Sequence, residues 1–445
     1  MSIRDLLLTL ILMGSIPVIL SRPYVGVIVW SWLGYMNPHR LAWGFAASFP
    51  FAQIVAITAV IAMLFSKEPK RIPWSREVVV LTIFLLWMCI TTITALEPDR
   101  ALMALIKVLK VQFMTYVTLM LMVKRERLHM LVWTIALSIG FFGVKGGIFT
   151  ILTGGNYLVW GPDNSFIAGN NGLAVAMLMI LPLFYYLSLQ DTRKLVRSGL
   201  FLAMFFTMVA ILGTHSRGAL LGVVAVVLFL IIKSEKRVGL LLSAFIILPL
   251  ILTFMPDAWW ERMGTIQTYE EDASAMGRIN SWWFAFNLAS DRIMGGGFEP
   301  IKHVWFIIYA PDPDDLHDFH SIYFQVLGEH GFIGLGLFLL LGGFTWRTAT
   351  WVISKSRGID ELKWASDLCR ALQVSLVAYI ISGAFLELAY FDFYYHIVVM
   401  IVICKVLVNE ELTKLGGLSK VQNTSINTVR STYPAKAMSR TDAKL

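Results

Sequence analysis

One long polar stretch interrupts a chain that is otherwise a succession of apolar runs. Residues 255–329 read MPDAWWERMGTIQTYEEDASAMGRINSWWFAFNLASDRIMGGGFEPIKHVWFIIYAPDPDDLHDFHSIYFQVLGE. The stretch holds 12 acidic residues against 4 basic ones, whereas the other polar segments of the chain are basic. It also holds 5 of the 15 tryptophans, and His317 and His320 stand near its end. We therefore expect residues 255–329 to form the functional surface of the molecule, and the apolar runs to anchor this surface at a bilayer.

The composition of the whole chain is typical of an α-helical membrane protein. Of the 445 residues, 57% are hydrophobic and 15% are charged, whereas soluble domains have about 25% charged residues. Runs of about 20 apolar residues recur, and each is long enough to cross ~30 Å of hydrocarbon as a helix. The alternating segments of about 10 residues that a transmembrane β-barrel needs do not occur in the sequence. The sequence therefore predicts an all-α, polytopic integral membrane protein.

The formal net charge of +8 does not indicate a nucleic-acid partner. The basic residues stand in short clusters between apolar runs, as the positive-inside rule expects of cytoplasmic loops. Taking these clusters as cytoplasmic predicts about twelve transmembrane helices and places residues 255–329 on the outer side. The short runs 5–21 and 24–36 contain or adjoin Pro17 and Pro23, so they form either one broken crossing or a re-entrant hairpin.

The chain is therefore expected to have four parts. Residues 1–254 form N-terminal transmembrane helices, and residues 255–329 form an outer loop with interfacial helices that carries the active site. Residues 330–410 form the C-terminal transmembrane helices. Residues 411–445 are rich in Ser, Thr and Lys, and this composition predicts a disordered cytoplasmic tail.

Several lysines lie inside the apolar runs, where such a charge costs roughly 2.5–3.5 kcal/mol at the bilayer centre. Arg100 and Lys107 are expected to share one side of a helix, and Lys110 follows Lys107 by about one turn. Snorkelling to a headgroup region explains Lys110 equally well. Lys145 stands in GVKGG (residues 143–147), where glycines allow close helix approach, so a polar cavity is favoured over lipid as its surroundings.

Two arginines extend this set of cations. Arg217 stands in the tight turn THSRG (residues 214–218) between two apolar runs, and its planar guanidinium suits bidentate phosphate binding. Arg278 opens a segment in which Trp282 and Phe286 recur at helical spacing, so we expect a helix in the outer interface. Headgroup pairing and simple aromatic anchoring are the plainer alternatives. Together the cations predict a site that grips an anionic headgroup, such as a lipid pyrophosphate.

His317 and His320 are spaced i, i+3, a spacing that paired metal ligands also use. No third ligand stands at a suitable spacing, and the three cysteines lie in or beside apolar runs, so neither a metal site nor a disulfide framework is predicted. A histidine near its reference pKa of about 6.5 is largely neutral at pH 7 and can accept the proton of a hydroxyl. Such a general base suits glycosyl transfer to an alcohol with pyrophosphate as the leaving group.

The run HSIYFQVLGEHGFIGL (residues 320–335) resembles the signature of the O-antigen ligase and polymerase superfamily. That signature has a histidine, usually followed by an asparagine where this chain has Ser321, then apolar residues, Glu-x-Gly, and a Gly-Leu that opens a transmembrane helix. SRGA (residues 216–219) resembles the family's Ser-Arg-Gly turn, and Arg278 with GGGF (residues 295–298) resembles its Arg…Gly-x-Gly-Phe stretch. The resemblance extends over residues 140–410.

The N-terminal part of the chain is similar to one branch of that superfamily. The run MNPHRLAWGF (residues 36–45), together with GVKGG (residues 143–147), is similar to O-glycosylation ligases of exosortase-linked gene clusters. The acceptors of that branch are not settled. The resemblance therefore leaves the acceptor of this chain open as well.

The resemblance implies a metal-independent, multi-span (GT-C-like) glycosyltransferase without a cofactor, in the bacterial inner membrane, with its active site facing the periplasm. Such an enzyme moves a preassembled glycan from undecaprenyl pyrophosphate to an acceptor hydroxyl, here expected to be that of lipid A–core oligosaccharide in lipopolysaccharide biosynthesis. A protein O-glycosylation ligase and an O-antigen or exopolysaccharide polymerase differ from it in the acceptor. A transporter or lipid flippase is the non-enzyme alternative, and it predicts symmetric halves and a polar pathway through both leaflets.

The resemblance also implies roles for individual residues. By their positions in the motifs, His320 is the expected catalytic base and Arg217 holds the pyrophosphate during catalysis. With the charge argument added, the expected donor-binding cations are Arg217, Arg278, Lys145, Lys107 and Arg100. The residues expected to support the site are His317, Ser321 and Glu329.

Overall fold

The fold was analysed in a computed structural model, which describes residues 3–42, 44–233, 255–264 and 273–432. These residues form helices joined by turns and contain no strand, so the predicted all-α class is confirmed. The long helices are α1 (Ile3–Ser21), α2 (Pro23–Met36), α3 (Phe51–Phe65), α4 (Arg76–Ile93), α5 (Pro98–Leu121), α6 (Arg125–Leu152), α7 (Asn170–Gln190), α8 (Lys194–Gly213), α9 (Arg217–Lys233), α14 (Ile322–Lys355), α15 (Lys363–Gly383) and α16 (Asp392–Thr432).

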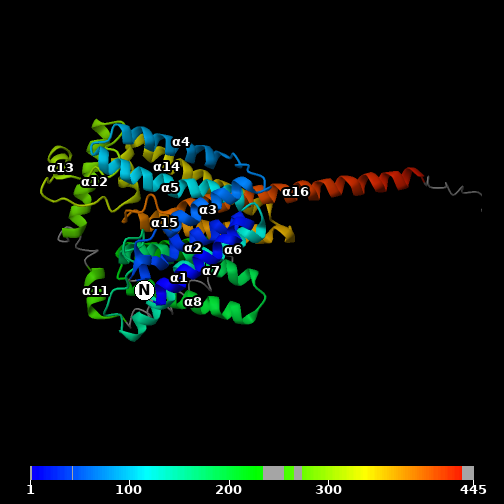
Figure 1. Ribbon diagram of the computed structural model, residues 1–445, viewed down its shortest axis with the longest axis horizontal. Coiled ribbons are helices and arrows are strands. Elements are labelled where there is room, and N and C mark those ends of the chain that lie inside the picture. The colour runs from blue at the N-terminus through cyan, green and yellow to red at the C-terminus, as the bar shows by residue number, and fades with distance from the viewer. Residues whose placement is uncertain (1–2, 43, 234–254, 265–272, 433–445) are drawn as a thin grey trace, which may run out of the picture.

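The polar stretch contributes shorter elements to the same chain. These are α11 (Asp257–Gly264), α12 (Ala273–Asp291) and α13 (His303–Tyr309), and three single 3₁₀ turns lie elsewhere at η1 (Pro38–Leu41), η2 (Phe45–Ala47) and η3 (Asp360–Leu362). Figure 1 shows α11, α12 and α13 gathered at one end of a bundle made by the long helices. The stretch 255–329 therefore does more than link two membrane helices.

Within the described residues, 8 helices are long and apolar enough to cross a membrane. They are α1, α4, α5, α6, α7, α8, α14 and α16. This confirms a polytopic membrane protein, while the predicted count of about twelve crossings remains a prediction.

The long helices run up and down, so their connections fall at two ends of the bundle. One end, here called the site end, carries the turns 94–97, 153–169, 214–216 and 384–391. Backbone hydrogen bonds connect these turns: Val159 N donates to Gly213 O at 3.0 Å, and Leu96 N donates to Gly296 O at 2.8 Å. The opposite end carries the loops 66–75, 122–124, 191–193 and 356–362, which hold predicted basic clusters.

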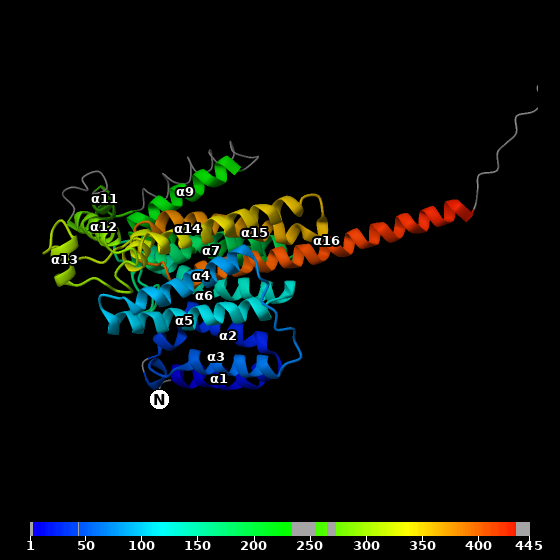
Figure 2. The same cartoon turned by 90° about the horizontal axis from the view of Figure 1, so that it is seen from above.

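The first two helices form a hairpin and not one broken crossing, which were the two alternatives open from the sequence. α1 ends at Ser21 and α2 begins at Pro23, a residue suited to the first turn of a helix. The start of α1 lies beside the segment that follows α2, because the Arg4 guanidinium donates to Leu41 O at 3.0 Å. Figure 2 shows α1, α2 and α3 side by side along one edge of the bundle.

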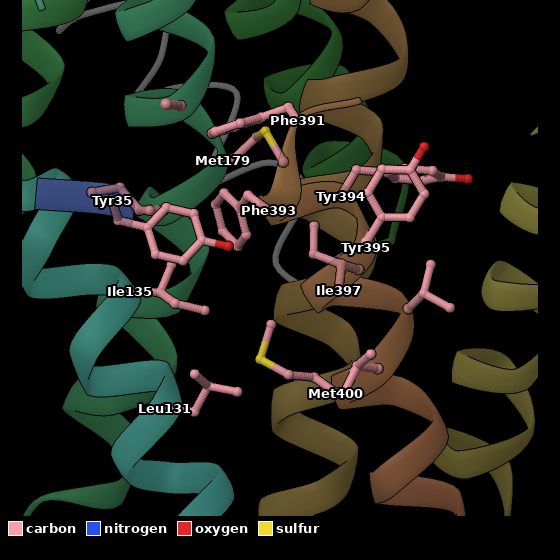
Figure 3. Close-up of a cluster of buried hydrophobic side chains, with 14 of the residues drawn as sticks. Tyr35, Leu131, Ile135, Met179, Phe391, Phe393, Tyr394, Tyr395, Ile397 and Met400 are labelled. Carbon is pink, nitrogen blue, oxygen red and sulfur yellow. The ribbon is translucent and has the colours of Figure 1, made fainter. Parts of the chain in front are cut away.

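The core is centred on α7 and on the first turns of α16. The most apolar 18-residue window is 89% buried in α7 and 78% buried in α16, so neighbouring helices surround both. Figure 3 shows Tyr35 of α2 directed toward Phe393 at the start of α16, with Phe391 nearby. The rings of Tyr35 and Phe393 meet edge to face with centroids 5.8 Å apart, an arrangement that aromatic quadrupoles favour.

The C-terminal segment differs from the prediction of a disordered tail from residue 411. α16 continues as a helix to Thr432 and extends beyond the bundle (Figures 1 and 2). The membrane-length part of α16 ends at Leu415, and no proline follows it before Pro434, so no residue there forbids a helix. Composition alone did not predict this continuation. Residues 433–445 lie outside the described part of the chain.

Candidate active site

A polar pocket of about 40 Å³ lies at the site end, where four parts of the chain meet. The first turn of α9 forms one side, α11 and α12 form another, and α7 with the end of α15 closes the rest. Two arginines predicted as phosphate ligands, Arg217 and Arg278, both line it. The lining residues are Asn171, Val175, Ser216, Arg217, Gly218, Ala219, Arg262, Ser274, Arg278, Ser382, Phe385 and Leu386.

The turn between α8 and α9 fixes the position of Arg217. Asn170 donates its side-chain amide to Thr214 O at 2.8 Å, and the ring of His215 bonds Gly155 O at 2.9 Å. Ser216 Oγ accepts from the N–H of Ala219 at 3.2 Å and so caps the start of α9. Arg217 is the first residue of α9, so its guanidinium stands at the positive end of a helix, where anions are favoured.

Helix α12 brings Arg278 to the same pocket and holds the histidine loop beside it. A Cβ atom at Gly277 would lie 2.4 Å from Nδ1 of His317, so only glycine lets this ring pack on the helix. Nδ1 of His317 is also 2.8 Å from a carboxylate oxygen of Asp315. His317 thus packs on Gly277, the residue before Arg278, and supports the loop that carries His320.

Three consecutive side chains of α12 hold the loop 312–320 by hydrogen bonds. The Asn280 amide donates to Asp312 O at 2.7 Å and to Asp315 O at 2.9 Å, and its carbonyl accepts from the N–H of Asp312 at 2.9 Å. Ser281 Oγ donates to His317 O at 2.6 Å, and Trp282 Nε1 donates to Phe319 O at 2.8 Å. The backbone that leads to His320, up to Phe319 directly before it, is therefore tied to the helix that carries Arg278.

Replacing Asn280 should loosen this loop. In Asn280→Ala three hydrogen bonds to the loop are lost, and with a typical net value of ~1 kcal/mol each we expect a loss of about 2–3 kcal/mol of stability. Turnover should fall more than donor affinity, because the Arg217 turn is untouched. Thermal unfolding and steady-state kinetics of the purified protein measure both. Asn287→Ala is the matched control: Asn287 lies on the same helix, but its one side-chain hydrogen bond among the described residues goes to Tyr309 O at 2.8 Å, outside the loop 312–320. Equal effects of the two variants would contradict this positioning role.

His320 has a strained backbone and a lowered pKa. Its φ angle is 44°, in the left-handed region that residues other than glycine seldom adopt. Burial is the main cause that lowers the pKa of the His320 imidazole, and the Arg278 guanidinium lowers it further, while Asp318 acts in the opposite direction. These effects favour the neutral ring, which can accept a proton at neutral pH.

The acid limb of the kcat/KM pH profile should shift in opposite directions when Arg278 and when Asp318 is neutralised. Arg278→Gln removes a cation that lowers the pKa of His320, so the acid limb of kcat/KM should move to higher pH. Asp318→Asn removes an anion that raises it, so that limb should move to lower pH. The measurement is kcat/KM across the acid range for both variants and the wild type. Shifts of the same sign, or none, would show that the limb does not report His320.

The other predicted donor cations do not line this pocket. The Arg100 guanidinium donates to Ile301 O at 3.0 Å and lies 3.4 Å from the Glu299 carboxylate. The Lys107 ammonium lies over the ring of Phe166, 4.5 Å from its centroid. Lys145 is exposed on the surface of α6, and the glycines around it pack on α8 instead.

Those glycines confirm the expected close helix approach. A Cβ atom at Gly147 would lie 2.1 Å from the carbonyl oxygen of Phe206 in α8, and one at Gly143 would lie 2.3 Å from Thr207 Oγ1. Because the glycine side of α6 faces α8, Lys145 is turned away from that contact.

Two further predicted residues are buried beneath the histidine loop. Ser321 directly precedes α14 and is 1% exposed. The Glu329 carboxylate accepts a hydrogen bond from the Tyr390 hydroxyl and another from the N–H of Glu299 at 3.3 Å. Gly297 N also donates to Glu329 O at 2.9 Å, so the glycine-rich loop pairs with this part of α14. Ser321 and Glu329 are thus placed to support the fold around the site.

Sequence reasoning missed several residues of the pocket region. Arg262 of α11 and Ser382 of α15 line the pocket, and nothing in the local sequence distinguishes Ser382. Glu387 lies in the following loop; burial, together with Asp318 and Glu299, raises its pKa to about 8. The basic character of Arg262 within the acidic stretch was the one available signal.

No set of three or more His, Cys, Asp or Glu side chains in the described ranges could hold a metal ion. The chemistry that the pocket offers is that of three guanidinium groups (Arg217, Arg262 and Arg278), a helix N-terminus and a neighbouring imidazole. Such an arrangement can neutralise a phosphorylated leaving group and accept a proton from an attacking hydroxyl.

Comparisons with known protein families agree with this geometry. Residues 3–192 match a family of unknown function, DUF5935, and residues 200–339 match the O-antigen ligase family. A comparison with curated proteins finds no match. The second matched region contains Arg217, Arg278 and His320, the three residues on which the sequence resemblance rested. The match of residues 200–339 to the O-antigen ligase family therefore supports the resemblance to the O-antigen ligase superfamily.

Proposed function

We propose that this protein is a ligase-type glycosyltransferase that moves a preassembled glycan from undecaprenyl pyrophosphate to the lipid A–core oligosaccharide. The family match supports a ligase-type function in glycan biosynthesis. Beyond this match, the donor and the acceptor are proposed here. The reaction is proposed to take place at the periplasmic face of the bacterial inner membrane. The basic loops at the opposite end of the bundle support this orientation, because cytoplasmic loops carry an excess of lysine and arginine.

One observation carries the proposal: Arg217 and Arg278 line the same pocket, and Arg278 acts electrostatically on His320. Arg217 comes from a helix start and Arg278 from α12, so two independent elements deliver cations to one place. Paired guanidinium groups suit the two phosphates of a lipid diphosphate. Arg100, Lys107 and Lys145 remain proposed outer contacts of the donor, away from the pocket.

The reaction follows from this arrangement. The hydroxyl oxygen of the acceptor attacks the anomeric carbon of the glycan, and the bond from that carbon to the pyrophosphate oxygen breaks. His320 takes the proton of the hydroxyl, and the negative charge left on the pyrophosphate is held by Arg217 and Arg278. Holding a developing anion in this way is commonly worth several kcal/mol of barrier.

An acceptor assay tests the proposal. Purified protein is given a lipid-linked glycan together with lipid A–core, a periplasmic protein acceptor or a growing polysaccharide. We expect product only with lipid A–core. Product with one of the other acceptors would instead identify a protein O-glycosylation ligase or a polymerase. Movement of the lipid-linked glycan across the liposome membrane without a new glycosidic bond would indicate that the protein is a transporter or flippase and not an enzyme.

A further inference from the structure

A second cavity lies at the opposite end of the bundle, far from the active site. It is an open groove of about 570 Å³ formed by α4, α14 and α16. Lys405 lies 13 residues after Asp392, which places it ~20 Å along α16 from the site end. Phe344 of α14 is also distant from the start of that helix at Ile322. The groove is lined by Trp74, Ser75, Arg76, Val79, Val80, Phe344 and Lys405.

The groove carries two cations that no described carboxylate neutralises. The Arg76 guanidinium lies over the ring of Phe344, 5.9 Å from its centroid, and the Lys405 ammonium lies over Trp351 at 6.0 Å. In the described ranges, neither cation has an acidic group within ion-pair distance. The hydroxyl of Ser75, at the start of α4, is buried at the groove without a hydrogen-bond partner among the described residues. These groups match an anionic oxygen-rich ligand.

Apolar surface continues from these cations toward the middle of the bundle. Val79 lines the groove and begins an exposed stripe on α4 that Ile83, Leu86 and Ile90 extend at helical spacing. Trp74 at the rim is 63% exposed, as a tryptophan at a membrane interface can be. A charged pocket that opens directly onto an apolar stripe fits a molecule with an anionic head and a hydrocarbon tail.

We propose that this groove binds an anionic phospholipid of the leaflet opposite the active site. Arg76 and Lys405 hold the phosphate from two different helices, and one acyl chain lies along the exposed stripe of α4. Basic pockets between transmembrane helices bind lipid headgroups in this way. The lipid would bridge α4 and α16, which both pack on α14. The inference goes beyond the proposed transferase function and does not depend on it.

Lipid retention tests the proposal. Detergent-purified full-length protein is stripped of lipid, titrated with dioleoyl phosphatidylglycerol or dioleoyl phosphatidylcholine, and examined by native mass spectrometry. The wild type should retain phosphatidylglycerol selectively, and Arg76→Gln with Lys405→Gln should weaken its binding about tenfold. Arg125→Gln is the matched control: Arg125 begins α6 at the same end and lies over Trp364 at 5.2 Å, but outside the groove. It should bind phosphatidylglycerol as the wild type does.

Three results would overturn the lipid assignment. The first is equal retention of phosphatidylglycerol by the double variant, and the second is equal retention of phosphatidylcholine by the wild type. The third is displacement of the lipid by millimolar inorganic phosphate, which would assign the groove to a soluble anion. If the double variant does not fold, Arg76→Lys with Lys405→Arg decides: both charges persist, so binding must persist too, and its loss contradicts the proposal.

Discussion

His320→Ala should abolish glycan transfer while the amount of protein in the membrane stays unchanged. A positioned general base contributes roughly 10²–10⁴-fold to a rate, so capped lipopolysaccharide should disappear from a ligase-deficient host that carries this variant. The structure supports a specific role for this histidine, because Asn280, Ser281 and Trp282 fix the loop that carries it and Arg278 tunes its pKa. The measurement is capped lipopolysaccharide on a gel, with membrane protein quantified in parallel.

The left-handed backbone at His320 provides a sharper control. Asparagine tolerates a positive φ better than most residues, so His320→Asn keeps the backbone conformation and removes the base. It should be as inactive as His320→Ala. His303→Ala removes a partly exposed histidine of α13, 3.5 Å from Asp314, and should leave transfer intact. Transfer by His320→Asn at wild-type rate would show that the imidazole is not the base.

Arg217 should prove irreplaceable even by lysine. Arg217→Ala removes a planar fork of donors from the start of α9, and Arg217→Lys keeps the charge but loses bidentate phosphate binding. We expect both to reduce kcat/KM by about 10²–10³-fold, as for loss of one group that stabilises a developing anion. Donor affinity, measured with the lipid pyrophosphate, should fall in both variants.

Thermal unfolding separates this role from a structural one. Arg217→Lys should lose much more donor affinity than stability, because lysine keeps the positive charge and the turn is also held by hydrogen bonds of Asn170, His215 and Ser216. Arg193→Ala, which removes an exposed arginine paired with Asp191 at the opposite end, should change neither affinity nor turnover. Unchanged donor affinity together with a lowered unfolding temperature would assign Arg217 to the fold instead.

Short motifs predicted the residues that meet in the pocket. Arg217 follows from a five-residue turn between two apolar runs, and Arg278 from aromatic residues at helical spacing. Both depend on local sequence, and the structure places both in one pocket. The position of His320 beside Arg278 was predicted only through the family resemblance, because 41 residues separate the two and the intervening loop folds back on α12.

The positions of Lys145, Lys107 and Arg100 away from the pocket could not be predicted from residue spacing. The sequence places them near the outer ends of apolar runs, but not on a particular side of each helix. Lys145 is turned outward because the adjacent glycines pack against α8, and Arg100 bonds the loop after α12. The side of a helix that faces the site is decided by contacts between distant segments, which residue spacing does not contain.

The fold class followed from composition, whereas the finer topology did not. Apolar length cannot decide whether residues 3–36 form one interrupted helix or two, and the structure shows two, with contacts from Gly26 to Ala59 and Ile19. A composition rich in Ser, Thr and Lys likewise suggested disorder where α16 continues to Thr432. Both cases depend on packing and on the start of the helix, not on average composition.

A photoreactive undecaprenyl pyrophosphate analogue tests most directly whether the donor occupies the pocket of Arg217 and Arg278. The reactive group is placed next to the pyrophosphate, the purified protein is irradiated, and the labelled peptides are sequenced. The proposed site predicts labels within residues 216–219 or 382–386, both of which line the pocket, and their loss in Arg217→Ala. Labels confined to segments that do not line the pocket, or unchanged labelling of the lining segments in Arg217→Ala, would contradict it.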